Sequence, residues 1–184
     1  MPKIAIIGTT TWGKTLGVVL SHEESEVRLW ARTQQEAAEL KQAGPNPELL
    51  PGAVFPPQLS VTSSLDEALT DAQVAIMAVP SQTMRRNIGL VRDHLGESVL
   101  VVSAGKGLEL GSCKRMSQVI AEEIAPHLRS NICVLSGPNL SREILRHVPA
   151  ATVVAAEKES VARKAQRLLA APNLCVYTNT DVIG

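Results

Sequence analysis

Residues 3–13, KIAIIGTTTWG, decide the fold. The run KIAII (residues 3–7) has the apolar pattern of a buried strand, and Gly8 and Gly13 follow it. Glycine at the first of these positions permits a tight turn, and glycine at the second lets a helix pack closely on the strand. The stretch therefore predicts a strand–turn–helix unit with the glycine spacing of a dinucleotide-binding fingerprint.

Short runs rich in valine and isoleucine alternate with helical patterns along the rest of the chain. Residues 74–79 and 99–102 are apolar throughout, as expected when helices cover both faces of a parallel sheet. The fold class is therefore α/β: a doubly wound, mostly parallel Rossmann-type sheet flanked by helices, in one domain over residues 1–184. We expect strands at residues 3–7, 26–30, 59–62, 74–79, 99–103, 132–135, 151–155 and 174–177, and helices at residues 13–21, 33–43, 65–69, 82–94, 113–125, 140–146 and 160–170. The proline-rich residues 44–57 predict a surface loop, because proline fixes φ and removes an amide donor.

The composition excludes several classes of function. The 184 residues include 18 Lys+Arg and 18 Asp+Glu, and aromatic residues make up 2%. This balance argues against a basic nucleic-acid surface and a polybasic membrane anchor, and no stretch approaches the roughly 18 apolar residues of a membrane span. The three cysteines are widely spaced without a CxxC pattern, so we predict no metal site. We expect a cytoplasmic protein whose partner is a small molecule, not nucleic acid or a membrane.

The first turn bears on phosphate binding. Free amides at the start of the helix would face a pyrophosphate, aided by the helix dipole. The middle glycine of the fingerprint is replaced by Thr10, whose branched side chain narrows the approach and would cost ~1 kcal/mol or more at positive φ. We expect the hydroxyls of Thr10 and Thr11 to offset this by donating to phosphate oxygens. The alternative is that Gly8 and Gly13 only permit a tight turn.

The second predicted strand ends in LWART (residues 29–33), with no Asp or Glu at the position where NAD-binding folds accept the ribose 2′-hydroxyl. Arg32 followed by Thr33 suits a 2′-phosphate, because a guanidinium pairs bidentately with phosphate and stacks on adenine. This favours NADP as cofactor, with NAD as the second choice. The alternative is that Arg32 is a solvated residue at a helix start.

Two later strand ends carry polar residues of interest. Lys106 stands between two glycines, which clear space for its ammonium to hold an anionic or carbonyl-bearing substrate. Residues 136–141, SGPNLS, predict a helix N-terminus near Pro138 that faces Lys106 as a second anion site. The alternatives are a surface lysine and an ordinary helix cap.

Taken together, these stretches resemble the N-terminal domain of the NAD(P)-dependent glycerol-3-phosphate dehydrogenases. The resemblance covers essentially the whole chain. The residues that carry it are 8–16 (GTTTWGKTL), 29–32 (LWAR), 46–47 (NP), 50–52 (LPG), 79–81 (VPS), 106–109 (KGLE), 136–138 (SGP) with Glu143, and 176–184 (VYTNTDVIG).

The resemblance implies reduction of dihydroxyacetone phosphate to sn-glycerol 3-phosphate for glycerophospholipid synthesis. It implies that Lys106 contacts both cofactor and substrate, and that Gly137 and Asn139 contact the substrate. The residues that it assigns to NADPH are Thr11, Trp12, Arg32 and Ser141. The sequence departs from the family at Thr10, where the middle glycine is expected, and at residues 139–141 (NLS), where Ser/Thr-Phe-Ala is more usual.

The resemblance also implies a second, helical domain beyond residue 184, which supplies the lysine that protonates the developing alkoxide. We therefore assign no catalytic residue here and expect the 184-residue chain to bind dinucleotide with little or no turnover. A homodimer of the full-length enzyme is expected from the family. Two alternatives stay open: a ketopantoate- or hydroxyacid-type reductase domain, and a regulatory dinucleotide-binding module without catalysis.

Overall fold

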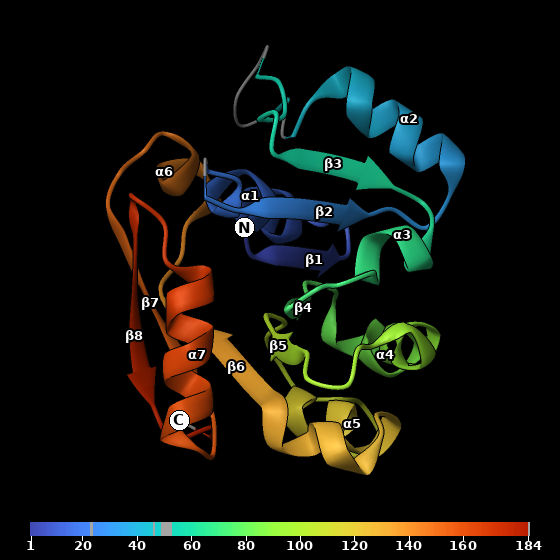
Figure 1. The fold of residues 1–184 in the computed structure, drawn as a ribbon, viewed down its shortest axis with the longest axis vertical. Helices are drawn as coiled ribbons and strands as arrows, with labels where there is room; N and C mark the ends of the chain where they lie inside the picture. Colours follow the sequence, from blue (N-terminus) through green and yellow to red (C-terminus); the bar gives the residue numbers. More distant parts are fainter. Residues whose placement is uncertain (23, 46, 49–52, 184) are drawn as a thin grey trace.

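The computed structural model describes residues 1–22, 24–45, 47–48 and 53–183 as a single sheet with helices on both faces (Figure 1). The strands are β1 (Lys3–Ile7), β2 (Glu26–Trp30), β3 (Leu59–Thr62), β4 (Val74–Met77), β5 (Leu100–Ser103), β6 (Ile132–Ser136), β7 (Ala150–Ala155) and β8 (Leu174–Asn179). The helices are α1 (Thr11–Leu20), α2 (Gln34–Ala43), α3 (Leu65–Leu69), α4 (Met84–Val91), α5 (Met116–Glu123), α6 (Ser141–Leu145) and α7 (Glu159–Leu169). No helix in these ranges has the length and apolar character that would let it cross a bilayer.

The order of the strands is β3-β2-β1-β4-β5-β6-β7-β8. Neighbouring strands are parallel except β6 and β7, which pair antiparallel. The first six strands thus have the doubly wound order in which the chain reverses direction across the sheet between β1 and β4. This confirms the predicted fold class and places a topological switch point directly after residues 3–7.

The sheet is buried on both faces, which explains its continuous apolar strands. Alternate residues of β1 point to opposite sides: Ile4 and Ile6 join one core cluster, and Ala5 and Ile7 join the other. Helices α1, α2, α6 and α7 contribute to the first cluster, and α3, α4 and α5 to the second. Helix α7 shows the pattern behind this packing, because its buried Ala162, Ala165 and Leu169 lie on one helical face.

Most predicted elements lie within a few residues of their expected bounds, but two differ. The expected helix over residues 82–94 is divided into α4 and two flanking 3₁₀ turns, Ser81–Thr83 and Arg92–His94. Helix α5 begins only at Met116, because the residues before it form a loop that contains Cys113 at φ 55°. Helix α6 begins at Ser141, within the helix expected over residues 140–146 and three residues after Pro138. Of the predicted loop over residues 44–57, residues 46 and 49–52 lie outside the described ones, and residues 53–58 form no helix or strand.

Thr10 ties the start of α1 to the end of β4. Its Oγ1 accepts a hydrogen bond from the Gly13 N–H at 3.1 Å and donates to the Ala78 carbonyl oxygen at 2.9 Å. Its backbone is extended, with φ −60° and ψ 162°, so the penalty expected for positive φ does not arise. Gly8 carries the positive φ of this turn instead, at 117°. Thr10 is therefore the N-cap of α1.

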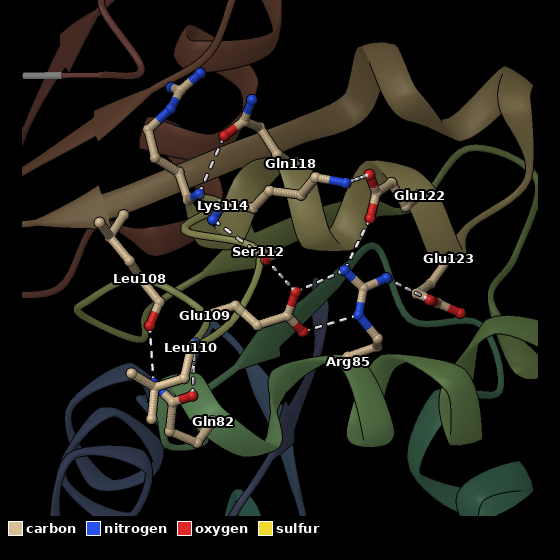
Figure 2. Close-up of polar contacts among 11 residues, drawn as sticks. Gln82, Arg85, Leu108, Glu109, Leu110, Ser112, Lys114, Gln118, Glu122 and Glu123 are labelled. Atoms are coloured by element: carbon tan, nitrogen blue, oxygen red, sulfur yellow. Dashed lines mark hydrogen bonds and ion pairs between the residues drawn. The ribbon is translucent and has the colours of Figure 1, made fainter.

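A second polar cluster holds the loop after β5 against α4 and α5 (Figure 2). Arg85 of α4 donates to both carboxylate oxygens of Glu109 at 2.8 Å, and to Glu122 and Glu123 at 2.8 and 2.7 Å. One turn earlier, the Gln82 side chain bonds the Leu108 carbonyl oxygen and the N–H of residue 110. The loop is thus fixed at its main chain and at one carboxylate, a few residues beyond Lys106.

Thr10→Val keeps the branched shape and removes the hydroxyl. Both hydrogen bonds are lost, so we expect the free energy of unfolding to fall by about 1–2 kcal/mol in urea denaturation. Thr10→Ser, which keeps the hydroxyl, should lose less than half of that. An unchanged unfolding midpoint in Thr10→Val would contradict the clamp between α1 and β4.

Arg85→Gln tests the cluster through its pH dependence. The hydrogen bonds from Arg85 lower the pKa of Glu109 to about 2. A carboxyl with a lowered pKa stabilises the fold above its ordinary pKa of about 4.3, and this contribution is lost as the pH falls toward the folded value. We expect the Tm difference between parent and Arg85→Gln to be largest above pH 5 and to shrink steadily toward pH 2. The exposed Arg167→Gln on α7 is the control, and a pH-independent difference in Arg85→Gln would exclude the ion pairs as its cause.

Candidate functional site

Two adjoining cavities open where the carboxyl ends of the parallel strands meet. The first, of about 280 Å³, lies over the ends of β1, β2 and β4 and is bounded by α4. The second, of about 380 Å³, lies over the ends of β4, β5 and β6. Thr10, Val79 and Pro80 line both, so the start of α1 stands between them. Ligands of open α/β sheets bind in this crevice at the switch point.

The turn after β1 brings its backbone close to the end of β4. A Cβ at Gly8 would lie 2.6 Å from the Ala78 carbonyl oxygen, and a Cβ at Gly13 would lie 2.2 Å from the Gly8 carbonyl oxygen. Neither position can hold a larger residue without moving the backbone. Gly8 lines the first cavity, whereas Gly13 packs α1 onto the turn behind it.

The groups at the start of α1 that are free to bind a ligand are backbone N–H groups, whereas the sequence predicts that threonine hydroxyls bind it. The N–H groups of Thr11 and Trp12 lie in the first turn and have no acceptor within the helix. The Thr10 hydroxyl proton goes to the Ala78 carbonyl, so the expectation that it donates to a phosphate is wrong. Thr11 is exposed and lines neither cavity, while Trp12 lines the second.

The end of β2 carries one cation and, from α2, one carboxylate. Arg32 lines the first cavity, and its side chain is 73% exposed. Thr33 lines neither cavity and caps α2 by accepting a hydrogen bond from the Glu36 N–H at 3.1 Å. The Glu36 carboxylate turns back to accept the Thr9 hydroxyl at 2.5 Å and the Arg32 N–H at 2.9 Å. An acid therefore reaches the end of β2 after all, although residues 29–33 contain none.

Glu36 is the residue that the sequence pattern does not assign to the site. The available signal is the spacing of Thr33 and Glu36, which matches the S/T-x-x-E pattern of a helix start. That pattern indicates where α2 begins. It does not indicate that the carboxylate reaches the glycine-containing turn, which depends on how β2 and β1 are placed side by side.

Lys106 lies at the second cavity, as its position after β5 predicts. Its Nζ donates to the Gly137 carbonyl oxygen at 2.9 Å and joins the two loops that follow β5 and β6. The flanking glycines are needed there: a Cβ at Gly105 would lie 2.9 Å from the Val79 carbonyl oxygen, and Gly107 has φ 109°. The ammonium is therefore held at the wall of the cavity by a neutral acceptor.

Asn139 and Ser141 complete the wall of the second cavity. The Asn139 Nδ2 donates to Thr152 Oγ1 at 3.0 Å, and its Oδ1 is buried with no hydrogen-bond partner among the described residues. A second anion site at the N-terminus of α6 stays a prediction, and the helix itself would add little to it, because α6 is five residues long and carries Glu143 in its first turn. Among the described residues, neither cavity is lined by an aspartate or glutamate, while Arg32, Arg86 and Lys106 line them. The site therefore suits an anionic ligand.

Comparison with known proteins identifies the family. The profile of the NAD-dependent glycerol-3-phosphate dehydrogenase N-terminus matches residues 3–162. The chain is 57% identical over its whole length to a glycerol-3-phosphate dehydrogenase [NAD(P)+] of Dehalococcoides mccartyi, of which it covers 52%, and 43% identical to one of Corynebacterium glutamicum, of which it covers 55%. The chain thus spans about half the length of these relatives.

Solved structures agree with this assignment. The glycerol-3-phosphate dehydrogenase of Coxiella burnetii superposes with a TM-score of 0.86 at 28% identity, covering 99% of this chain and 55% of that one. A ketopantoate reductase of Ralstonia eutropha superposes with a TM-score of 0.69 at 18% identity, covering 98% of this chain and 57% of that one, a likeness that shows the fold alone. Several motif residues of the predicted resemblance, namely 46, 50–52 and 184, lie outside the described part of the chain. With a profile match over residues 3–162 and a two-cavity site at the switch point, the chain belongs to the NAD-dependent glycerol-3-phosphate dehydrogenase family, in the region of its N-terminal domain.

Proposed function

We propose that residues 1–184 form the dinucleotide-binding domain of an enzyme that reduces dihydroxyacetone phosphate to sn-glycerol 3-phosphate with NADP(H), or with NAD(H). The observation that carries the proposal is the pair of adjoining, cation-lined cavities on either side of the start of α1, in a chain of this family. Two cavities joined at a helix N-terminus match a ligand with a diphosphate between two nucleoside halves.

The residues present fit such a cofactor. The free N–H groups of Thr11 and Trp12 suit the diphosphate, and the lack of a side chain at Gly8 lets the diphosphate approach the backbone of the turn. Arg32 at the far end of the first cavity suits the adenosine half. The second cavity, near Lys106 and Ser141, is left for the nicotinamide, which supplies the hydride when the cofactor is bound.

Two residues that line the second cavity, Lys106 and Asn139, support the substrate proposal. Lys106, held by the Gly137 carbonyl, presents a positive charge to a phosphorylated or carbonyl-bearing ligand. The unpartnered Oδ1 of Asn139 is suited to accept a hydrogen bond from a substrate hydroxyl. Together these residues orient the substrate toward the cofactor, and orientation is a large part of catalysis by such enzymes.

The remaining parts of the proposal concern the longer protein. We propose that the proton donor lies in a helical second domain, that the enzyme is a homodimer, and that it works in the cytoplasm for glycerophospholipid synthesis. The three free cysteines, Cys113, Cys133 and Cys175, support a reducing compartment. Burial raises the pKa of the Cys133 thiol to about 12, so this residue suits a packing role and not nucleophilic chemistry.

Titration with NADPH, followed by the fluorescence of the reduced nicotinamide, tests the domain assignment. We expect saturable binding of one NADPH per 184-residue chain and little or no NADPH oxidation on addition of dihydroxyacetone phosphate. Absence of binding at millimolar NADPH would overturn the cofactor proposal. Rapid turnover by this chain alone would overturn the proposal that a second domain supplies the proton.

Lys106→Met tests the substrate wall. Replacing a charged hydrogen-bonding group by an isosteric apolar one should weaken sn-glycerol 3-phosphate binding to the NADPH-saturated chain about tenfold or more, because such bonds contribute about 1.5–3 kcal/mol. Calorimetric titration measures the effect, and Lys158→Met, exposed at the start of α7, is the matched control. Equal substrate affinity in Lys106→Met and the parent would remove Lys106 from the substrate site.

A further inference from the structure

The Glu36 carboxylate is held at the edge of the first cavity by residues that line it. Its Oε1 accepts from the Thr9 hydroxyl at 2.5 Å, and its Oε2 accepts from the Arg32 N–H at 2.9 Å. The Nε of Arg32 lies 4.0 Å from the same Oε2. Both Thr9 and Arg32 line the cavity, and the Glu36 side chain keeps 27% of its surface exposed. The carboxylate is therefore held in one place at the end of β2, against two residues that line the first cavity.

The Glu36 carboxylate lies where NAD-binding folds have an acid at the end of the second strand, although Glu36 comes from a helix. There, a carboxylate accepts a hydrogen bond from the ribose 2′-hydroxyl and repels a 2′-phosphate. Here the strand end holds Arg32, and the carboxylate comes from the first turn of α2. The end of β2 thus has one group that favours NAD, the Glu36 carboxylate, and one that favours NADP, the Arg32 guanidinium.

A second arginine faces the same cavity from α4. Arg86 is exposed, lines the first cavity and forms no ion pair among the described residues. Its neighbour in sequence, Arg85, pairs instead with Glu109, Glu122 and Glu123. The Arg86 guanidinium therefore has its full charge available to a ligand, in contrast to Arg85.

We propose that Glu36 and Arg86, two residues outside the glycine fingerprint, set the choice between NADP and NAD at this site. Glu36 accepts the 2′-hydroxyl of NAD and opposes the 2′-phosphate of NADP, while Arg86 adds to Arg32 in attracting that phosphate. The inference rests on the proposed dinucleotide function and specifies its cofactor preference: the site accepts both cofactors, because opposing charges converge on it.

Glu36→Gln is the direct test, since it removes the charge and keeps a side chain that can still accept a hydrogen bond. In titrations of the 184-residue chain, we expect the Kd for NADPH to fall about tenfold, equivalent to about 1.4 kcal/mol, and the Kd for NADH to rise a few-fold. The matched control is Glu39→Gln, an exposed acid one turn along α2 that bonds Gln35. It removes the same charge from the same helix and should change the ratio of the two Kd values less than twofold.

Arg86→Gln tests the proposed attraction between Arg86 and the 2′-phosphate of NADP. We expect NADPH binding to weaken about tenfold and NADH binding to change less than twofold, with Arg92→Gln in the 3₁₀ turn after α4 as the control. Titration with 2′,5′-ADP and 5′-AMP isolates the adenosine end, and 2′,5′-ADP alone should respond to Arg86→Gln.

The outcomes separate this inference from the proposed function. If the parent chain binds both dinucleotides and neither Glu36→Gln nor Arg86→Gln moves their ratio beyond its control, the inference is wrong and the proposed function stands. If the parent chain binds neither dinucleotide nor 2′,5′-ADP, both are overturned. A ratio that moves equally in Glu36→Gln and Glu39→Gln would reduce the effect to net charge and also overturn the inference.

Discussion

The contact on which the structure depends is the meeting of three backbone segments without an intervening side chain. A Cβ at Gly13 would lie 2.2 Å from the Gly8 carbonyl oxygen, and a Cβ at Gly8 would lie 2.6 Å from that of Ala78. The turn after β1, the first turn of α1 and the end of β4 are therefore in direct van der Waals contact. Thr10 adds two hydrogen bonds at the same point. Because this junction sits at the switch point of the sheet, it fixes where the two cavities open and which amides face them.

Acidic and basic side chains occupy different places around this junction. Glu109, Glu122 and Glu123 all pair with Arg85 on the side of α4 that faces α5, where Lys114 also pairs with Glu122 and Arg92 with Glu123. Three other cations, Arg32, Arg86 and Lys106, line the cavities. Acidic side chains therefore hold the loop after β5, and basic side chains line the cavities. An anionic ligand would therefore meet mostly positive charge in the two cavities, with the Glu36 carboxylate at the edge of the first as the exception.

The pattern of apolar residues and turn formers along the sequence is sufficient to predict the fold and part of the site. Strands β1, β2 and β3 lie at the predicted residues because β1 is a short apolar run, and β2 and β3 alternate polar and apolar residues. The glycine turn, Arg32 and Lys106 were also predictable, since the carboxyl ends of parallel strands converge wherever the strands are correctly placed. Contacts that cross between elements were not. The return of Glu36 to Thr9, the use of the Thr10 hydroxyl within the fold and the break of the helix over residues 82–94 depend on distances between segments, which periodicity along one segment does not contain.

The manner in which α4 holds the loop after β5 has an evolutionary consequence. Gln82 bonds the carbonyl of Leu108 and the N–H of Leu110, and the side chains of these two leucines are 51% and 81% exposed. At Leu110 the hold is on the main chain alone, so the structure imposes almost no requirement on the side chain at that position. Related sequences are therefore free to diverge at residue 110 while Lys106 stays in place, whereas Leu108 belongs to the KGLE stretch that carries the family resemblance.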